Sequence, residues 1–379
     1  MLKLPPLALY IHLPWCERKC PYCDFNSYQA ESEPPFAAYA ECLLADLRAD
    51  CDLVEGRALG SLFFGGGTPS LFPAPVLART LRGIAATIDF APDVEITLEA
   101  NPGSAERDRF SALHAAGVNR LSLGVQSFCD QSLRALGRIH DAADARSAIA
   151  AAKAAGFTNI NLDLMHGLPG QDVAMAMRDL EQAVTGNVPH ISWYQLTIEP
   201  NTAFHGRPPL LPVDDLLAEI QDRGEELLMR HGYTQYEVSA WARPGAQCRH
   251  NLNYWSFGDY IGIGAGAHGK LSRVRAGEIL RTRKTRSPRD YLEAQVGSSR
   301  TRVRVAPGEL ALEFMMNVLR LREGCSFEDF EARTGIAVAT IASQLDTLRA
   351  QGLMSSEPGR IATTETGFRF LNVVLERFS

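Results

Sequence analysis

The fold of this chain is decided by Cys16-Glu-Arg-Lys-Cys20-Pro-Tyr-Cys23, a stretch that spaces three thiols as CxxxCxxC. It directly follows residues 7–13, an apolar run that predicts a β-strand. Thiolates are soft anionic ligands, and a short loop that carries three of them can hold three corners of a cubic iron–sulfur cluster. The fourth iron of such a cluster is open to a substrate or cofactor.

A zinc site is the competing interpretation of these cysteines. Structural zinc takes four ligands, most often as two CxxC pairs, whereas Asp24 and Phe25 follow Cys23 and no second pair exists. The remaining five cysteines are scattered without paired spacing, at positions 42, 51, 129, 248 and 325. The pattern therefore favours a cluster over zinc, over three unliganded thiols and over a disulfide framework.

Length and composition set the broad class. The chain has 379 residues, 46% of them hydrophobic, which is enough for one large domain and a smaller one. The formal net charge of -6 gives no reason to expect a nucleic-acid partner. No stretch has the apolar length of a membrane span, and the N-terminus lacks a signal-peptide or transit-peptide pattern. We therefore expect a cytoplasmic protein in a reducing compartment.

A repeated strand–helix pattern runs from residue 7 to about residue 197. The predicted strands cover residues 7–13, 61–64, 95–100, 120–125, 159–165 and 191–197. Amphipathic stretches predict helices between them over residues 36–53, 75–88, 105–116, 142–155 and 173–184. Six such units indicate a parallel sheet, either open or curled into a barrel. In both cases ligands bind at the carboxyl ends of the strands.

The rest of the chain follows another pattern. Residues 212–240 predict a helix and a strand-like run, and a Gly/His/Asn-rich region follows to residue 270. The basic stretch 281–304 contains Pro288 and Gly297 and is interpreted as a polar linker. Helices over 309–321, 327–333 and 338–351, a strand pair near 353–362 and a final helix outline a winged helix. The predicted domains are therefore 1–240, 241–304 and 305–379.

A second motif, Gly65-Gly-Gly-Thr-Pro69, ends the second predicted strand. Consecutive glycines let the backbone approach a ligand closely and expose N–H and C=O groups to it. An amino or carboxylate group of a small cofactor requires such a surface. Taken alone, the motif is equally well explained as a simple turn.

Polar residues also stand at the ends of later strands: Glu99, Gln126, Arg138 and Asp163. Burying a charge in an apolar parallel strand is costly unless the charge is paired or solvated, so Glu99 and Asp163 indicate a polar cavity. Arg138 can bind a carboxylate through two parallel hydrogen bonds. Satisfied polar groups in the core are the alternative for any one of these residues.

Together with Glu99-Ala-Asn-Pro102, Gly124-Val-Gln-Ser127 and Gly167-Leu-Pro-Gly-Gln171, these motifs resemble the radical S-adenosylmethionine superfamily. The closest branch is that of oxygen-independent coproporphyrinogen III oxidase, HemN. The resemblance covers nearly the whole chain. It implies an α/β fold, a partial (β/α)6 TIM-like radical SAM barrel with a C-terminal winged-helix-like, α-rich domain.

The resemblance also implies the cofactors and their ligands. Cys16, Cys20 and Cys23 would hold a 4Fe-4S cluster, whose open iron binds S-adenosylmethionine through its amino and carboxylate groups. Arg138 suits the methionine carboxylate, and the acidic residues suit ribose hydroxyls or the amino group. The residues implied for the S-adenosylmethionine site are Tyr10, Tyr22, Gly66, Gly67, Thr68, Glu99, Gln126, Arg138 and Asp163.

Two departures separate the chain from the oxidase. The oxidase has a fourth cysteine two positions after the third, where this chain has Phe25, and it has an extension before the cluster loop, where only fifteen residues precede Cys16 here. Both argue against coproporphyrinogen decarboxylation, which stays the alternative function in porphyrin biosynthesis. We assign no catalytic residue, and whether the chain is an enzyme is left open.

The third motif is His250-Asn-Leu-Asn-Tyr254-Trp255. A neutral imidazole is a common axial ligand of haem iron, and aromatic rings can stack on a porphyrin. By itself the motif is better explained as a packed loop with a capped helix start. In this chain it resembles the HNxxYW signature of the haem-chaperone branch, HemW. That resemblance implies haem binding by His250 and haem transfer to acceptor haem proteins, respiratory ones among them.

The C-terminal tail and the basic stretch bear on further partners. Residues 309–377 carry ten acidic and seven basic residues, and the helix predicted over 338–351 has a single arginine, Arg349. DNA binding needs several cations, so we expect no nucleic-acid partner. For residues 281–304, contact with an anionic membrane surface or with haem propionates is the alternative to a solvated linker. A dimer is compatible with the sequence.

Overall fold

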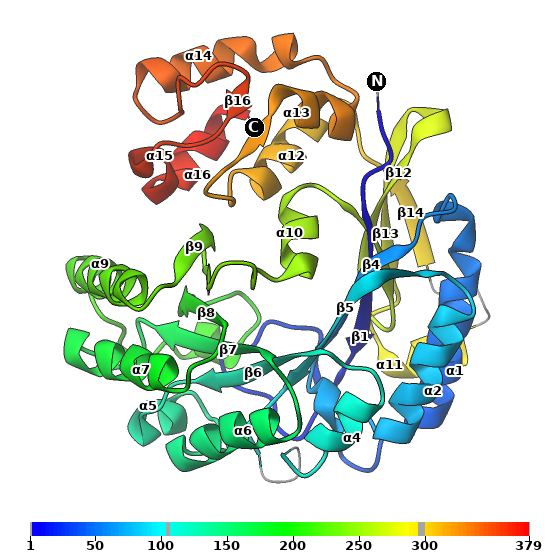
Figure 1. Ribbon diagram of the computed structural model, residues 1–379, viewed down its shortest axis with the longest axis vertical. Coiled ribbons are helices and arrows are strands. Elements are labelled where there is room, and N and C mark those ends of the chain that lie inside the picture. Colours follow the sequence, from blue (N-terminus) through cyan, green and yellow to red (C-terminus); the bar gives the residue numbers. More distant parts are fainter. Residues whose placement is uncertain (1, 104–106, 295–299, 379) are drawn as a thin grey trace.

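The described residues of the computed structural model, 2–103, 107–294 and 300–378, form one mixed sheet of twelve strands (Figure 1). The strand order is β14-β13-β12-β11-β1-β4-β5-β6-β7-β8-β10-β9. Six neighbouring strands in the middle run parallel to one another. They are β1 (Leu7–Leu13), β4 (Leu59–Gly66), β5 (Phe90–Ala100), β6 (Arg120–Gln126), β7 (Asn159–His166) and β8 (His190–Gln195). Their carboxyl ends share one edge, so the loops that follow them meet there.

Further strands extend the sheet at both sides. β11 (Asp259–Ile263) pairs in parallel with β1, and antiparallel β12 (His268–Arg273), β13 (Glu278–Lys284) and β14 (Arg300–Arg304) follow. At the other side β10 (Ala240–Ala242) and β9 (Thr234–Glu237) add two antiparallel strands next to β8. β1 therefore lies inside the sheet with a parallel neighbour on each side.

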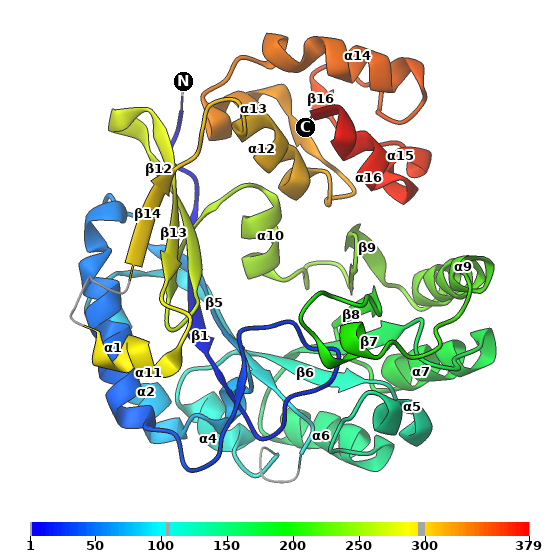
Figure 2. The same cartoon turned by 180° about the vertical axis from the view of Figure 1, so that it is seen from behind.

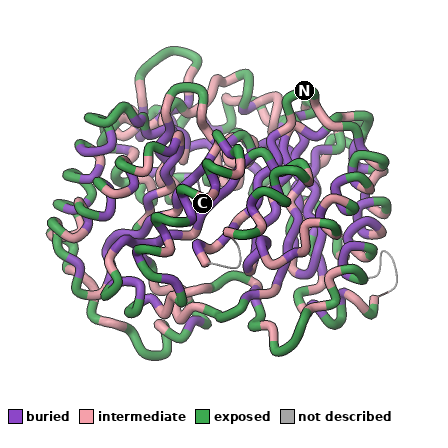
Figure 3. The backbone as a smooth tube through the Cα atoms, turned by 60° about the horizontal axis from the view of Figure 1, so that its bottom comes forward, coloured by how far each residue is buried: buried purple, intermediate pink, exposed green. Residues whose placement is uncertain are grey.

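Helices cover the outer face of the curled sheet (Figures 1 and 2). α6 shows why they form: Asp141 and Asp144 make a capping box, and the buried Ala145, Ala148 and Ala152 recur on one face. The helices are α1 (Phe36–Ala49), α2 (Ala74–Ala85), α4 (Phe110–Ala115), α5 (Asp130–Ala135), α6 (Ala142–Ala154), α7 (Val173–Thr185), α9 (Asp214–Arg230) and α11 (Pro288–Glu293). Burial is concentrated in the strands and on the inward sides of these helices (Figure 3).

The sequence predicted the six parallel strands and the helices that separate them, with ends that differ from those observed. The strand predicted over 61–64 is β4, and the strand predicted over 95–100 is the longer β5. The helix predicted over 105–116 is present as α4 from Phe110, and residues 105 and 106 of that prediction lie outside the described residues.

The prediction of a polar linker over 281–304 is wrong. This stretch contains most of β13, all of α11 and β14, and the two strands belong to the main sheet. Pro288 stands in the first turn of α11, where its missing N–H costs nothing, and Gly297 lies outside the described residues. The charges misled the prediction because they are paired within the fold: Lys284 bonds Asp46 and Asp50, and Arg300 and Arg302 also bond Asp50.

The C-terminal part has a hydrophobic core of its own, which includes Phe314, Phe330, Leu348 and Val374. Its elements are α12 (Leu310–Val318), β15 (Cys325–Ser326), α13 (Phe327–Thr334), η4 (Val338–Ile341), α14 (Ala342–Ala350), β16 (Arg360–Ile361), α15 (Glu365–Arg369), α16 (Leu371–Leu375) and η5 (Glu376–Phe378). The strand pair predicted near 353–362 differs in its partners, because β16 pairs with β15 and Met354 makes a single bridge to Thr363. The division of the chain at residues 240 and 304 stays a prediction.

The remaining elements are short, and one of them lies inside the curl of the sheet. α10 (Arg249–Trp255) stands between the inner face of the sheet and the C-terminal part (Figures 1 and 2). The others are β2 (Trp15–Cys16), β3 (Tyr28–Gln29), η1 (Cys51–Leu53), η2 (Pro69–Leu71), α8 (Ala203–Gly206) and η3 (Val274–Ala276). Throughout the described ranges, no helix is both long and apolar enough to cross a bilayer.

Buried His166 makes the fold sensitive to acid. The residue is 4% exposed, its ring centroid lies 4.3 Å from that of Trp193, and Nδ1 has no hydrogen-bond partner among the described residues. Burial lowers the pKa of His166 to about 4. Between pH 6.5, the pKa of an unfolded histidine, and about pH 4, the unfolded chain binds more protons than the folded chain does. The free energy of unfolding therefore falls as the pH falls through this range.

We expect His166→Phe to remove this dependence while keeping the aromatic contact. The free energy of unfolding of the parent should fall by about 2 kcal/mol more than that of the variant between pH 7 and pH 5. Urea denaturation at both pH values measures the difference. His205→Gln on the exposed side of α8 is the control and should behave like the parent. Equal losses in parent and His166→Phe would contradict the assignment.

Candidate functional site

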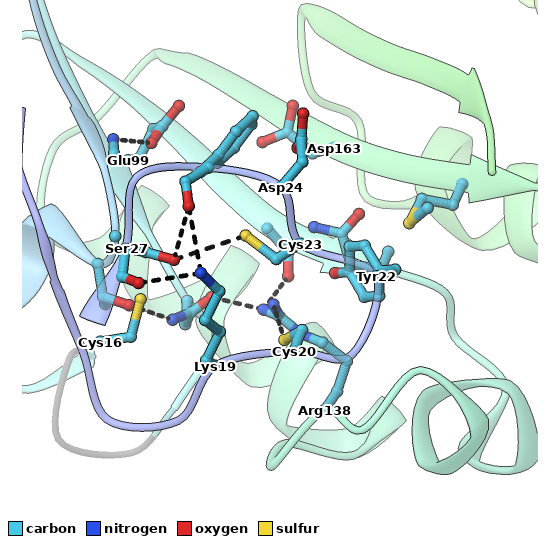
Figure 4. A pocket seen from close by; sticks show the side chains of 18 of the residues that line it. Cys16, Lys19, Cys20, Tyr22, Cys23, Asp24, Ser27, Glu99, Arg138 and Asp163 are labelled. Atoms are coloured by element: carbon cyan, nitrogen blue, oxygen red, sulfur yellow. Dashed lines mark hydrogen bonds between the residues drawn. The ribbon is translucent and has the colours of Figure 1, made fainter. Parts of the chain in front are cut away.

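A cavity of about 460 Å³ lies at the carboxyl ends of the parallel strands (Figure 4). It brings together residues from the cluster loop, the glycine turn and the ends of β5 to β8. Of the residues predicted from the sequence, it is lined by Cys16, Cys20, Cys23, Tyr22, Gly66, Gly67, Thr68, Glu99, Gln126, Arg138 and Asp163. The structure therefore brings these residues together around one cavity, although Arg138 follows α5 and not a strand. Their binding roles stay predictions.

The cysteine loop is fixed at both ends by backbone pairing. β2 pairs in parallel with β3, and Ala30 N donates to the Cys16 carbonyl at 2.9 Å. Within the loop, Cys23 N donates to the Cys20 carbonyl at 3.1 Å, and Lys19 Nζ donates to the Ser27 carbonyl at 3.1 Å. Figure 4 shows the three cysteines at separate positions around this loop. Burial raises the pKa of Cys16 and of Cys23.

The glycine turn after β4 is locked onto the cysteine loop. Gly67 N donates to the Leu13 carbonyl and Thr68 N to the Trp15 carbonyl, both at 2.8 Å. A Cβ on Gly67 would lie 2.5 Å from the Trp15 oxygen, and Gly66 has φ +122°. Both positions therefore require glycine, because the turn packs closely against the protein's own chain. That the turn also approaches a ligand stays a prediction.

Arg138 is buried beside the loop that carries the thiols. Its guanidinium donates to the Gly124 carbonyl at 2.8 Å, to Asn101 Oδ1 and to Cys20 Sγ at 3.5 Å. Its Nε is buried and has no partner among the described residues. A buried donor without an acceptor is costly, so this atom favours an acceptor such as a carboxylate in the cavity.

Glu99 and Asp163 face the same cavity from β5 and β7 (Figure 4). Burial, with a contribution from the charge of Asp163, raises the pKa of Glu99 to about 8. Burial also raises the pKa of Asp163, although Ser122 and Asn161 donate hydrogen bonds to it at 2.8 Å. Glu99 is therefore largely protonated near neutral pH and can donate a hydrogen bond as well as accept one, and Asp163 can accept hydrogen bonds from hydroxyl or amino groups.

The donor set fits a cluster better than a single ion. In the part of the chain that the structure describes, no group of three or more His, Cys, Asp or Glu side chains is placed so that it could hold one metal ion. Three thiols that line one cavity without converging on one point suit the separate corners of a cubic cluster. The unpartnered Arg138 Nε and the two carboxyl groups suit a small zwitterionic cofactor with hydroxyl groups.

Tyr10 and His250 do not line the cavity. The Tyr10 hydroxyl and His12 Nδ1 lie 2.9 Å apart, and the Tyr10 ring is 6.4 Å from that of His250. His250 is 3% exposed; its ring stacks on Phe63 at 4.9 Å, and the Ser61 hydroxyl lies 3.2 Å from Nδ1. Burial, and then the charge of Arg120, lowers the pKa of His250 to about 3, so the imidazole is neutral.

Sequence reasoning missed several residues of the site. Asn101 links Arg138 to Thr68, whose hydroxyl accepts from Asn101 Nδ2 at 3.1 Å, and the Tyr194 hydroxyl donates to Gln126 Oε1 at 2.7 Å. Asn101 directly follows β5, and Tyr194 lies at the end of β8. Because the carboxyl ends of parallel strands share one edge of the sheet, their positions in the sequence could have identified both residues. Lys19 and Phe25 also line the cavity, and Phe25 is 58% exposed at the position without a fourth cysteine.

We expect Gly67→Ala to lower the amount of cluster that the protein binds. The added methyl group meets backbone that cannot give way, and overpacking of this kind costs about 1–3 kcal/mol. Iron and sulfide content after anaerobic reconstitution measures the effect. The control is Gly60→Ala in β4, the strand that precedes the turn, where the atom nearest to the added Cβ is 3.8 Å away. Equal cluster content in the two variants would show that the turn does not support the loop.

Comparison with known proteins agrees with this geometry. The radical SAM superfamily matches residues 10–183, and the HemN C-terminal domain matches residues 305–370. The solved structure of coproporphyrinogen III oxidase (HemN) from Escherichia coli has a TM-score of 0.82 at 22% identity and covers 99% of this chain and 90% of its own. At that identity the likeness shows the fold alone, and it confirms the predicted α/β radical SAM architecture.

Curated relatives are closer in sequence. "Heme chaperone HemW" of Escherichia coli is 50% identical over 378 residues, covering 100% of this chain and 99% of its own. The protein of the same name from Haemophilus influenzae is 50% identical over 382 residues with the same coverage. The bovine mitochondrial "radical S-adenosyl methionine domain-containing protein 1" is 37% identical, covering 97% of this chain and 86% of its own. The chain belongs to the HemW family of the radical SAM superfamily.

Proposed function

We propose that this chain binds haem and transfers it to acceptor haem proteins, on a scaffold that carries a 4Fe-4S cluster and S-adenosylmethionine. The observation that carries the proposal is 50% identity over the full length to proteins named heme chaperone. The chain also has His250, Tyr254 and Trp255 in the HNxxYW pattern, placed together on α10.

The residues of the cavity would hold the two cofactors. Cys16, Cys20 and Cys23 would bind the cluster, which when bound supplies an iron with an open coordination position. Arg138 would orient a carboxylate, and Glu99 and Asp163 would accept hydrogen bonds from hydroxyl or amino groups. The Gly66–Gly67 backbone would form the wall nearest the ligand.

Haem ligation by His250 requires α10 to move. The imidazole is enclosed by Phe63 at 4.9 Å and Tyr254 at 4.8 Å, and it does not line the cavity of about 460 Å³. α10 has seven residues, and a short helix can shift at modest cost. Its shift would expose a neutral imidazole together with two aromatic rings, Tyr254 and Trp255, which suits binding to a porphyrin.

The setting of this activity is part of the proposal. Three free thiols must stay reduced to bind a cluster, so a reducing compartment such as the cytoplasm fits. Respiratory haem proteins are the acceptors that we expect. Peripheral contact with a membrane through the exposed Arg283 and Arg286, and dimer formation, are further expectations.

We expect His250→Ala to weaken haem binding at least tenfold, which is about 1.4 kcal/mol, and to leave the cluster intact. The test is anaerobic cluster reconstitution followed by haem titration with and without S-adenosylmethionine. His166→Ala is the matched control, because it also removes a buried imidazole that contacts an aromatic ring. Added imidazole should restore the haem spectrum of His250→Ala only. Equal haem binding by parent and variant would show that His250 is not the ligand.

The same preparation tests the alternative function. Reconstituted protein is incubated anaerobically with reductant, S-adenosylmethionine and coproporphyrinogen III. We expect no protoporphyrinogen, because Phe25 stands where the oxidase has a cysteine. Its formation would overturn the chaperone proposal in favour of an oxidase.

A further inference from the structure

A continuous chain of buried hydrogen bonds crosses the inside of the barrel from the cavity to α10. It begins at Asp163, which lines the cavity and accepts from Asn161 Nδ2 at 2.8 Å. Asn161 Oδ1 lies 2.6 Å from His190 Nδ1, and His190 Nε2 lies 2.8 Å from the Tyr236 hydroxyl. Cys248 N, at the N-cap of α10, donates to that hydroxyl at 3.4 Å.

The donors in this chain all point the same way. Asn161 Oδ1 can only accept, so His190 Nδ1 must carry the proton. The ring is neutral, because burial holds the pKa of His190 well below its usual range. His190 Nε2 then accepts from Tyr236, whose oxygen is free to accept from Cys248 N. Hydrogen bonds aligned in this way strengthen one another, so each bond depends on the acceptor strength of Asp163.

A second contact ties the start of α10 to the same interior. Glu95 accepts from Arg249 N at 3.1 Å and from His250 N at 3.2 Å. The buried Arg120 guanidinium interacts with the charges of both Glu95 and Asp163. The first turn of α10, which contains His250, is therefore bonded to Glu95. Glu95 interacts through Arg120 with the charge of Asp163 at the cavity.

We propose that the chain Asp163–Asn161–His190–Tyr236–Cys248 couples occupancy of the cavity to release of α10. A ligand hydroxyl or amino group that donates to Asp163 weakens this carboxylate as an acceptor for Asn161. The bonds behind it weaken in turn, and the N-cap of α10 loosens. His250 then becomes available, so S-adenosylmethionine strengthens haem binding and haem strengthens S-adenosylmethionine binding by the same factor. This inference rests on the proposed function.

The test uses Tyr236→Phe, which removes one hydroxyl from the middle of the chain. Tyr233→Phe is the matched control, because its buried hydroxyl donates to the Val188 carbonyl at 2.6 Å outside the chain. In reconstituted parent and control we expect saturating S-adenosylmethionine to lower the haem Kd about fivefold or more. In Tyr236→Phe we expect less than about a twofold change. His190→Phe keeps an aromatic ring against Tyr236 and should show the same loss of the S-adenosylmethionine effect on the haem Kd. This second variant keeps the test valid if Tyr236→Phe does not fold.

Hydrogen exchange gives a second readout that needs no haem. The amides of Arg249 and His250 should exchange faster in the parent when S-adenosylmethionine is bound, and should not respond in Tyr236→Phe. If the parent binds haem but S-adenosylmethionine changes neither haem affinity nor this exchange, the coupling is refuted and the haem proposal stands. An equal response in Tyr236→Phe and parent also refutes it. If the parent binds no haem, the proposed function fails, and the exchange data alone decide the coupling.

Discussion

The parallel pairing of β1 with both β4 and β11 is the constraint on which the other features depend. It places an apolar strand between two neighbours, so both of its hydrogen-bonding edges are paired and its carboxyl end opens onto the shared edge of the sheet. The chain leaves β1 directly into the cysteine loop. The position of the thiols relative to the glycine turn is thus set by strand register and by the bonds of Gly67 and Thr68 to Leu13 and Trp15.

The inside of the barrel is polar, and this polarity is divided between two regions. At the carboxyl ends, Glu99, Asp163 and Arg138 line a cavity that can admit a ligand. Below it, Glu95, Asn161 and His190 are buried and bonded to one another or to α10. Asp163 belongs to both regions, because it lines the cavity and accepts from Asn161. Ser122 also lines the cavity and accepts from Asn161 at 2.7 Å, so Asp163 and Ser122 together connect the cavity to the buried bonds that lead to α10.

How much could be predicted from the sequence depended on the range of the interactions. The strands, the cysteine loop, the glycine turn and the polar residues from Glu99 to Asp163 are encoded by local patterns, whereas Tyr22 was implied by the family resemblance alone. The linker prediction failed because the partners of its charges are remote: Lys284 bonds Asp46, which is 238 positions earlier. The burial of His250 was also out of reach, since Phe63 and Ser61 come from a strand that no local pattern relates to α10.

The C-terminal core has a consequence for how the chain can be cut. Phe257, which follows α10, and Ile279 of β13 are packed in that core with Phe314 and Phe330. A barrel expressed without residues after 304 would expose these two side chains to water, and an isolated tail would lose part of its interior. The two parts match separate families in sequence but share these core residues, so a truncation would disturb the packing of both parts and is a poor way to assign their separate roles.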